Sequence, residues 1–473
     1  MDSTAFSDLR RFRQDLHGCF ERAADALMDT CDALLLESGA RSFAELSLSP
    51  FFRRRWPSLY EAVQDAQVDR AALRRVFAGA VQAPRAGRRL VLGIDASPIL
   101  RPQSRTAKDR TYVHTQDAPR RKAGKAGKKT GKTGAAPTTA VGVGWNFSAL
   151  ALLPETPSSW TFLLDNQRID SSQTPAEVAA EQLAAVLPLL PTAAEVGTEV
   201  PLPLLTGDRY YGSATFVAQS QDVACDKLLR IQSHRVFYHP PPPHNRRRGA
   251  PRKDGERFKC NAPDTHSRPD QQWQGRDDKG GLVEVTCWRQ LHFQACRKVR
   301  LSVVRVVRHS ARDTKRDPRE SWFIWVPGAP PSATGGVDTV PLEEIAPLYA
   351  LRFSLEHGFR FDKQSLLWEK PRLRSPEQFQ TWTDVVAAAH NQLVLARPLA
   401  QAQRQPWEGH QRQRAVTPQQ TRRGLGRIIA ELGTPARAPQ PRGKSPGRRA
   451  GAIIQPARRY PVVYKAAAKP ILV

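Results

Sequence analysis

A tyrosine, an arginine, a glutamate and a lysine follow one another at intervals of three, four and seven residues: Tyr349, Arg352, Glu356 and Lys363. On an α-helix, which turns 100° per residue, these intervals bring all four side chains onto one narrow stripe. Such a stripe combines a carboxylate, a ligand for hard cations, with groups that bind phosphate. The plainer alternative is a solvated helix face with an ion pair between Arg352 and Glu356, four residues apart.

Two aspartates upstream each follow a short apolar run. Asp95 ends the run Leu-Val-Leu-Gly-Ile-Asp, and Asp208 ends Leu-Leu-Thr-Gly-Asp in a glycine-flanked turn. Such runs predict buried β-strands, and open α/β sheets place their chemistry just beyond the carboxyl ends of strands. Either aspartate alone fits a turn residue or a helix cap. Together with Glu356 they predict a set of carboxylates, which suits Mg²⁺ or Mn²⁺.

This combination of two strand-end aspartates with Tyr-x2-Arg-x3-Glu-x6-Lys resembles the DDE transposases of bacterial insertion sequences, in the branch with the Tyr-Arg-Glu-Lys signature (the IS-four-like superfamily). The resemblance covers residues 88–400. It implies an α/β fold, with an RNase H-like mixed sheet and flanking helices, interrupted by an all-β insertion. It also implies that Asp95, Asp208 and Glu356 are catalytic and bind two divalent ions, Mg²⁺ or Mn²⁺. Paired ions can stabilise both the entering and the leaving oxygen of a phosphodiester exchange.

The function implied by the resemblance is cleavage of DNA at transposon ends and transfer of the strand into target DNA. The implied partners are the terminal inverted repeats and the target DNA, with a homodimer in the synaptic complex. By the same resemblance, Tyr349, Arg352 and Lys363 contact DNA phosphates. Two alternatives stay open: an RNase H-like nuclease or resolvase on the same core, and a transposase-derived DNA-binding protein without activity.

The composition favours a polyanionic partner. The chain of 473 residues carries 72 Lys and Arg against 45 Asp and Glu, a net charge of +27. A field of this sign favours DNA or RNA, with an anionic membrane surface as the alternative. No apolar run approaches the roughly 18 residues that span a bilayer, and the N-terminus lacks a basic-then-apolar signal. Six scattered cysteines fit a reducing cytoplasm, and the resemblance implies a bacterial protein associated with the nucleoid.

Two basic runs are predicted to contact DNA phosphates without sequence preference. The first joins the strand of Asp95 to the next strand, and the second opens the insertion. For the first run, a loop that is merely soluble is the alternative. The residues concerned are Lys122, Lys125, Lys128, Lys129 and Lys132 in the first run and Arg246, Arg247 and Arg248 in the second.

The chain divides into five parts on composition and periodicity. Residues 1–87 are predicted to be helical, and the resemblance implies that they form a DNA-end-binding domain; a dimerisation or packing module is the alternative, because no helix-turn-helix pattern stands out. The other four are the first part of the core at 88–234, a β-rich insertion at 235–340, the final core helices at 341–400 and a basic, extended Pro/Arg-rich tail at 401–473.

The core elements are expected in RNase H order. Parallel strands of this kind need helical crossovers. Strands one and four end at Asp95 and Asp208, and the other elements are strands at 138–153, 159–165 and 227–232 and a crossover helix at 175–187.

Two further features of the insertion suggest possible roles. Relatives in this branch stack a flipped base on an insertion-domain tryptophan, which makes Trp325 a candidate for DNA contact; packing in the β core is the alternative. Cys260, Cys287, His292 and Cys296 raise the question of zinc. Their spacing lacks Cys-x2-Cys pairs, so we expect buried, reduced cysteines instead.

Overall fold

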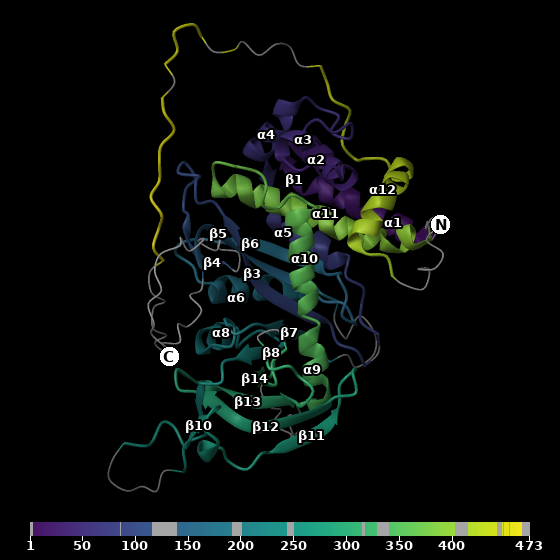
Figure 1. The fold of residues 1–473 in the computed structure, drawn as a ribbon. Coiled ribbons are helices and arrows are strands. Elements are labelled where there is room, and N and C mark those ends of the chain that lie inside the picture. The colour runs from purple at the N-terminus through teal and green to yellow at the C-terminus, as the bar shows by residue number, and fades with distance from the viewer. Residues whose placement is uncertain are drawn as a thin grey trace, which may run out of the picture.

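The computed structural model describes most of the chain. The described residues are 3–85, 87–115, 140–191, 201–243, 250–314, 317–328, 340–402, 415–441, 447, 449–453 and 455–465. They form a mixed α/β molecule, in which the N-terminal and C-terminal helices gather at one end and a large sheet extends away from them (Figure 1). Within these residues, no helix has the length and apolar character that crossing a membrane requires.

The N-terminal helices pack against the long helix α11 (Pro376–Ala402). Apolar residues at helical spacing, such as Leu9 and Leu16, are fully buried. The buried Arg13 guanidinium donates a hydrogen bond to Gln392 of α11 (2.5 Å), which ties the two regions together. The elements are α1 (Ser3–Gly18), β1 (Phe20–Arg22), α2 (Ala24–Leu36), α3 (Phe43–Leu46), α4 (Trp56–Asp65), β2 (Gln67–Val68) and α5 (Arg70–Gly79).

The central strands form a mixed sheet. Their bounds are β3 (Val91–Leu100), β4 (Thr111–Thr115), β5 (Ala140–Leu152), β6 (Phe162–Ile169), β7 (Leu204–Gly207) and β8 (Asp226–Ile231). Five of them lie in the order β6-β5-β3-β7-β8, where β3, β7 and β8 are parallel and β5 and β6 are antiparallel to their neighbours. This order is compatible with the RNase H-like core that the sequence predicts.

The strands of residues 235–340 extend the same sheet. Their bounds are β9 (Val236–Tyr238), β10 (Arg257–Lys259), β11 (Gln271–Arg276), β12 (Leu282–Phe293), β13 (Cys296–Arg308) and β14 (Glu320–Val326). Strand β14 pairs with the core strand β8, and the order continues through β13, β12, β9 and β10, with β11 also on β12. The β-rich segment is therefore hydrogen-bonded directly to the edge of the core.

Helices cover both faces of the central strands. Ser148 of β5 donates to Gln182 of α6 (Pro175–Val186; 2.7 Å). The preceding residue, Phe147, packs its ring against Phe379 of α11 at a centroid distance of 5.4 Å. Successive residues of a strand point to opposite faces, so α6 and α11 lie on opposite sides of the sheet. A short helix, α8 (Ala214–Gln219), packs beside α6.

Three further helices complete the C-terminal part: α9 (Leu342–Ala350), α10 (Phe353–Gln364) and α12 (Pro418–Leu432). The expectation of an extended tail beyond residue 401 was wrong for α12. Its start has a capping box, in which Thr417 and Gln420 each accept a hydrogen bond from the other's backbone amide. Leu425 and Ile428 bury its apolar face. Beyond it, Val463 returns to the sheet and bridges β4.

Candidate active site

Asp95 and Asp208 lie on neighbouring parallel strands. Ile94 of β3 pairs in register with Gly207 of β7, so the residues that follow, Asp95 and Asp208, are adjacent. Asp208 directly follows the end of β7, as expected. Asp95 differs from the prediction, because β3 does not end there but continues to Leu100 along β5. The strand-end aspartate of the sequence is therefore a mid-strand aspartate in the structure.

The two carboxylates are oriented by backbone amides. Asp95 Oδ1 accepts a hydrogen bond from the amide of Ala96 (2.8 Å), and Asp208 Oδ1 accepts one from Tyr210 (2.9 Å). Burial raises the pKa of Asp95 to about 6; the Arg352 guanidinium opposes this, while the charge of Asp208 adds to it. Asp95 is thus a partly buried acid, with an 18% exposed side chain, in the electrostatic field of a second carboxylate and of an arginine.

The signature residues lie on two helices instead of one. Helix α9 ends before Arg352 and α10 begins after it. Two tight turns join them, with the Arg352 amide bonded to the Tyr349 carbonyl (3.2 Å) and the Leu355 amide to the Arg352 carbonyl (3.0 Å). Pro347 lacks an amide hydrogen and breaks the regular bonding of α9. The prediction of one continuous helix was therefore wrong at this point.

Arg352 bridges two of the three carboxylates. Its Nη1 donates to Glu356 Oε1 (2.9 Å), and its Nη2 donates to Asp95 Oδ2 (3.1 Å). The Arg352 side chain is 10% exposed, whereas that of Glu356 is 49% exposed. Burial would lower the pKa of Arg352, but the negative charges around it, first that of Asp95, raise it above its ordinary value. Arg352 therefore carries a fixed positive charge between the carboxylates.

Tyr349 and Lys363 lie on either side of Arg352 and Glu356 in the sequence and have contacts of their own. The Tyr349 ring packs edge-on against Phe323 of β14 at 4.8 Å, and burial raises the pKa of its hydroxyl. Lys363 Nζ donates to the carbonyl of Pro98 on β3 (3.1 Å) and lies 6.0 Å from the Trp368 ring. Tyr349 therefore faces the β-rich segment, and Lys363 faces the far end of β3.

Tyr211 is a site residue that sequence reasoning missed. It is 1% exposed, and burial raises the pKa of its hydroxyl, with the charges of Asp95 and Asp208 adding to the effect. Its amide donates to the Asp208 carbonyl (3.1 Å), so both residues belong to one turn. The signal in the sequence was its position three residues after Asp208. A neutral phenol here gives the carboxylates an apolar but polarisable wall.

A buried ion pair anchors the helix that carries Glu356. Asp362 of α10 accepts from His390 Nδ1 of α11 (2.7 Å), and His390 Nε2 donates to the backbone carbonyl of Thr161 (2.9 Å). Both imidazole nitrogens donate, which requires a protonated ring. Burial would lower the pKa of His390, but the Asp362 carboxylate and the hydrogen bonds raise it. Gly358 lies against Thr161, where a Cβ would come within 2.7 Å of the hydroxyl.

Trp325 packs inside the β-rich segment. It is 6% exposed, and its neighbours in register are Ser302 and Leu228 on the two adjoining strands. The Arg89 guanidinium lies 5.6 Å from the ring centroid. In this structure the ring performs the packing role that was the alternative to base stacking. Stacking on a flipped base would require the ring to leave this core.

The cysteines are free and buried. Of the four residues considered for zinc, Cys287 has its pKa raised by burial to about 12. His292 is held by side chains instead, with Nε2 donating to Asp254 (3.0 Å) and Nδ1 accepting from Arg300 (2.6 Å). Across the described ranges, no three His, Cys, Asp or Glu side chains gather closely enough to hold a metal ion. Asp95, Asp208 and Glu356 likewise do not form a closed metal-binding cluster here. The Arg352 guanidinium lies between Asp95 and Glu356.

Both basic runs lie outside the described residues. The first falls in 116–139, and the second falls in 244–249. Lys122, Lys125, Lys128, Lys129, Lys132, Arg246, Arg247 and Arg248 therefore stay predictions from the sequence.

Comparison with known families identifies the chain. Residues 15–290 match the model of the DDE superfamily endonucleases. The chain belongs to this family, which makes it a nuclease or transposase-type enzyme with DNA as its partner. Enzymes of this family typically use divalent metal ions. The matched region includes Asp95 and Asp208 and ends before Glu356. A comparison with curated proteins gives no match.

Proposed function

We propose that the chain is the DNA transposase of an insertion sequence, which cleaves one strand at a transposon end and joins the freed 3′ hydroxyl to target DNA. The observation that carries this proposal is the adjacency of Asp95 and Asp208, with Glu356 connected to Asp95 through Arg352. A nuclease or resolvase would use the same carboxylates. The complete Tyr-Arg-Glu-Lys set beside them favours the transposase.

Asp95, Asp208 and Glu356 fit the ligand preference of Mg²⁺ or Mn²⁺, which take carboxylate oxygens. The fit is supported by the Arg352 guanidinium, because a cation already binds Asp95 Oδ2 and Glu356 Oε1 in this structure. The three carboxylates would hold two ions. Bound there, such ions stabilise the entering and leaving oxygens of a phosphodiester exchange.

The chain's own cations would orient the DNA strand. Arg352 is a planar, fork-shaped donor that can exchange a carboxylate for two phosphate oxygens. Tyr349 and Lys363, which flank it, would hold the neighbouring phosphates. The carbonyl of Pro98 now accepts from Lys363, and a neutral acceptor of this kind is readily exchanged for a phosphate.

The direct test is strand transfer by the purified chain. The substrate is a labelled duplex that carries the terminal repeat flanking the gene, incubated with Mg²⁺ and a supercoiled target plasmid. We expect a nick that leaves a 3′ hydroxyl at the repeat end and then joined products in the plasmid. Nicking of any duplex without joining would favour the nuclease instead. Binding without cleavage in both Mg²⁺ and Mn²⁺ would favour an inactive DNA-binding protein.

Arg352→Gln should separate the two roles of this arginine. Loss of its phosphate contact should weaken binding of repeat-end DNA by about tenfold. Loss of its charge should also relieve competition for the carboxylates, so Mn²⁺ should stabilise the variant at lower concentration than the wild type in a thermal-shift titration. Arg360→Gln, at an exposed position on α10, the helix that follows Arg352, is the control. An unchanged Mn²⁺ midpoint would show that the guanidinium does not compete with the metal.

The lysine run should contribute to DNA affinity through its charge. Replacing Lys122, Lys125, Lys128, Lys129 and Lys132 together by glutamine should weaken binding and flatten its dependence on salt. Each lost phosphate contact lowers the slope of log affinity against log salt by roughly 0.9. Fluorescence anisotropy at several salt concentrations measures this slope. If the slope keeps its wild-type value, the run is a solvated loop.

A further inference from the structure

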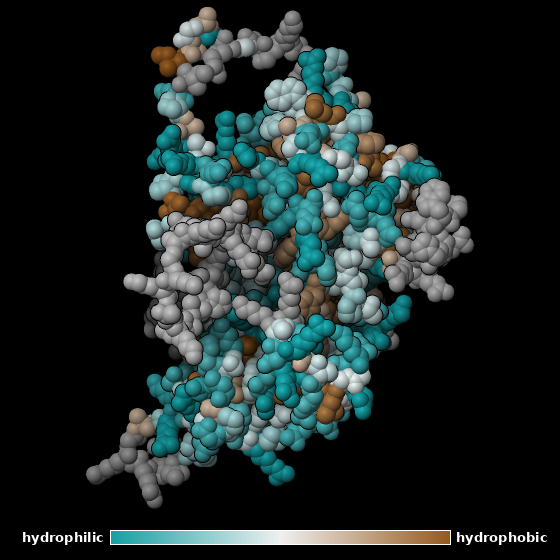
Figure 2. Space-filling model, viewed as in Figure 1, coloured by the Kyte–Doolittle hydropathy of each residue, from teal (hydrophilic) through white to brown (hydrophobic). Residues whose placement is uncertain are grey.

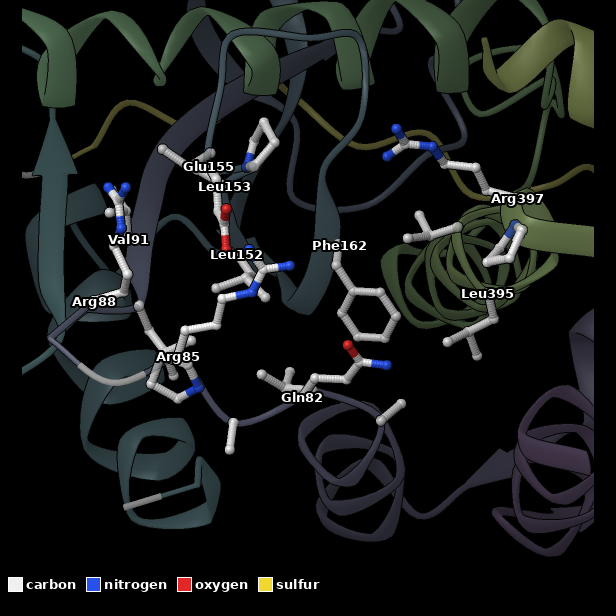
Figure 3. A pocket seen from close by; sticks show the side chains of 18 of the residues that line it. Gln82, Arg85, Arg88, Val91, Leu152, Leu153, Glu155, Phe162, Leu395 and Arg397 are labelled. Atoms are coloured by element: carbon white, nitrogen blue, oxygen red, sulfur yellow. The ribbon is translucent and has the colours of Figure 1, made fainter. Parts of the chain in front are cut away.

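A cavity of about 750 Å³ lies at the other end of β3 from Leu100, between the linker that precedes β3 and the end of α11. We call it the arginine cavity. Its volume is within the range of roughly 300–1,000 Å³ that small-molecule sites occupy. Figure 3 shows Arg85 and Arg88 on the linker side and Arg397 across the cavity on α11, with Phe162 between them. The linker and α11 are some 300 positions apart in the sequence.

The charge of the arginine cavity is unbalanced. Arg89 is neutralised by Asp226 (2.9 Å), and Arg397 lies over the Trp160 ring at 5.6 Å. Arg85 and Arg88 are exposed and form no ion pair with any described carboxylate. The cavity also contains the carboxylates of Asp8 and Glu155, and Asp8 already pairs with Arg11 (2.8 Å). The surplus is positive, which selects an anionic ligand.

The wall of the cavity is apolar. Phe162, Leu152, Leu153 and Leu395 line it together with several prolines. A free inorganic anion gains nothing from such a wall, whereas a ligand with a phosphate and a flat apolar body uses both parts of the cavity. A nucleotide, with a base and a phosphate, has this combination. The face of the molecule drawn in Figure 2 is largely hydrophilic, with scattered hydrophobic residues.

The arginine cavity lies around one end of β3: its residue Val91 is on the same face of the sheet as Asp95, and Leu152 and Phe162 are on the opposite face. Val91 lines the cavity, and Asp95 follows four residues later, so their side chains point to the same side of the strand. Asp95 pairs with Ala149, two residues from Phe147, which identifies this side as the one covered by α11. Four residues of strand span roughly 13 Å. A DNA strand advances 3.4 Å per nucleotide in the duplex, so this span equals about four nucleotides.

We propose that the arginine cavity holds a nucleotide unit of the DNA strand, about four nucleotides from the phosphodiester that is cleaved at Asp95, Asp208 and Glu356. Arg85 and Arg88 bind its phosphate, and the base lies against Phe162 and the neighbouring leucines. This inference rests on the proposed function, because it takes those carboxylates as the point of cleavage. A nucleotide bound in the arginine cavity would fix the distance between the end of the DNA strand and the phosphodiester that is cleaved.

The first test is the double variant Arg85→Glu/Arg88→Glu in the full chain. Binding of a fluorescein-labelled repeat-end duplex, followed by anisotropy, should weaken about tenfold or more, and the salt slope should fall by roughly 1.8. Arg312→Glu/Arg319→Glu makes the same charge change at exposed positions of the β13–β14 hairpin. This control should keep the wild-type slope. Equal slopes in the two double variants would overturn the proposal.

The second test locates the contact. 4-Thiothymidine is placed singly at successive positions of the cleaved strand, and the crosslinked peptide is identified by mass spectrometry. Crosslinks to residues 80–91 or 394–401 should peak about four nucleotides from the cut. A peak elsewhere, or crosslinks only to other peptides, would contradict the assignment. Free dAMP at millimolar concentration should not displace the duplex; displacement would assign the cavity to a free nucleotide and overturn its role as a strand site.

Neither binding readout depends on catalysis. If the chain binds and crosslinks DNA as expected but never cleaves it, the proposed function is wrong and the arginine cavity is still a nucleotide-binding site. A chain that cleaves and transfers strands while the Arg85→Glu/Arg88→Glu variant binds like the control would remove only the inference about the arginine cavity.

Discussion

Glu356→Gln should reduce DNA cleavage by about 10³-fold or more while leaving DNA binding nearly unchanged. Glutamine keeps the volume of the side chain and an oxygen that can accept the hydrogen bond from Arg352, now 2.9 Å from Glu356. It removes the negative charge that two divalent ions would need to offset their mutual repulsion. Gel assays of end cleavage and anisotropy with the same duplex measure the two effects separately.

The three carboxylates should act as a unit. Asp95→Asn and Asp208→Asn should reduce cleavage to a similar extent, and combining either with Glu356→Gln should cost little more, because effects within one catalytic unit are not additive. Glu343→Gln, at an exposed position on α9, is the matched control and should cleave like the wild type. Two results would show that Glu356 does not act with the aspartates as one catalytic unit. One is multiplicative losses in the double variants, and the other is cleavage by Glu356→Gln at more than about a tenth of the wild-type rate.

The positions of β5, β7 and β8 could be predicted because each is an apolar run with its own boundary signal, whereas β4 was not predicted and β6 continues beyond the predicted end at residue 165 to Ile169. The expected crossover helix at 175–187 is α6, whose Thr174 cap and Pro175 are visible in the sequence. The end of β3 could not be predicted in this way. Ala96 to Leu100 is a less uniform run, and it becomes strand because β5 offers a partner along its whole length. Tertiary pairing, which local patterns do not encode, extended the strand.

The candidate active site, like the fold, could be predicted from the sequence only in part. Stripe spacing predicted that Arg352 and Glu356 would be neighbours, as they are. It did not predict that Arg352 would also reach Asp95, because that contact depends on the turn between α9 and α10 and joins residues 257 positions apart in the sequence. No local sequence pattern predicted the arginine cavity either, because Arg85 and Arg397 come to line the same cavity through the packing of α11 on the sheet. Contacts between segments that are far apart in the sequence could not be predicted from local sequence patterns.

Asp362→Asn should lower the free energy of unfolding by about 3–5 kcal/mol near pH 6. The change leaves the buried His390 imidazolium without its counterion, 1% exposed and bonded on its other side to a backbone carbonyl. Urea denaturation followed by tryptophan fluorescence measures the loss. Asp65→Asn, at an exposed position on α4, should change stability by less than about 0.5 kcal/mol. A loss of that small size in Asp362→Asn would show that the pair does not anchor α10.

The effect should also depend on pH in a defined direction. The folded pKa of His390 is raised above that of the unfolded chain, near 6.5. The stability that this pair contributes is therefore fully present below about pH 6.5 and is lost as the pH rises through the folded pKa. The gap between the wild type and Asp362→Asn should narrow over that range. A gap that widened with pH would mean that His390 is neutral in the folded protein.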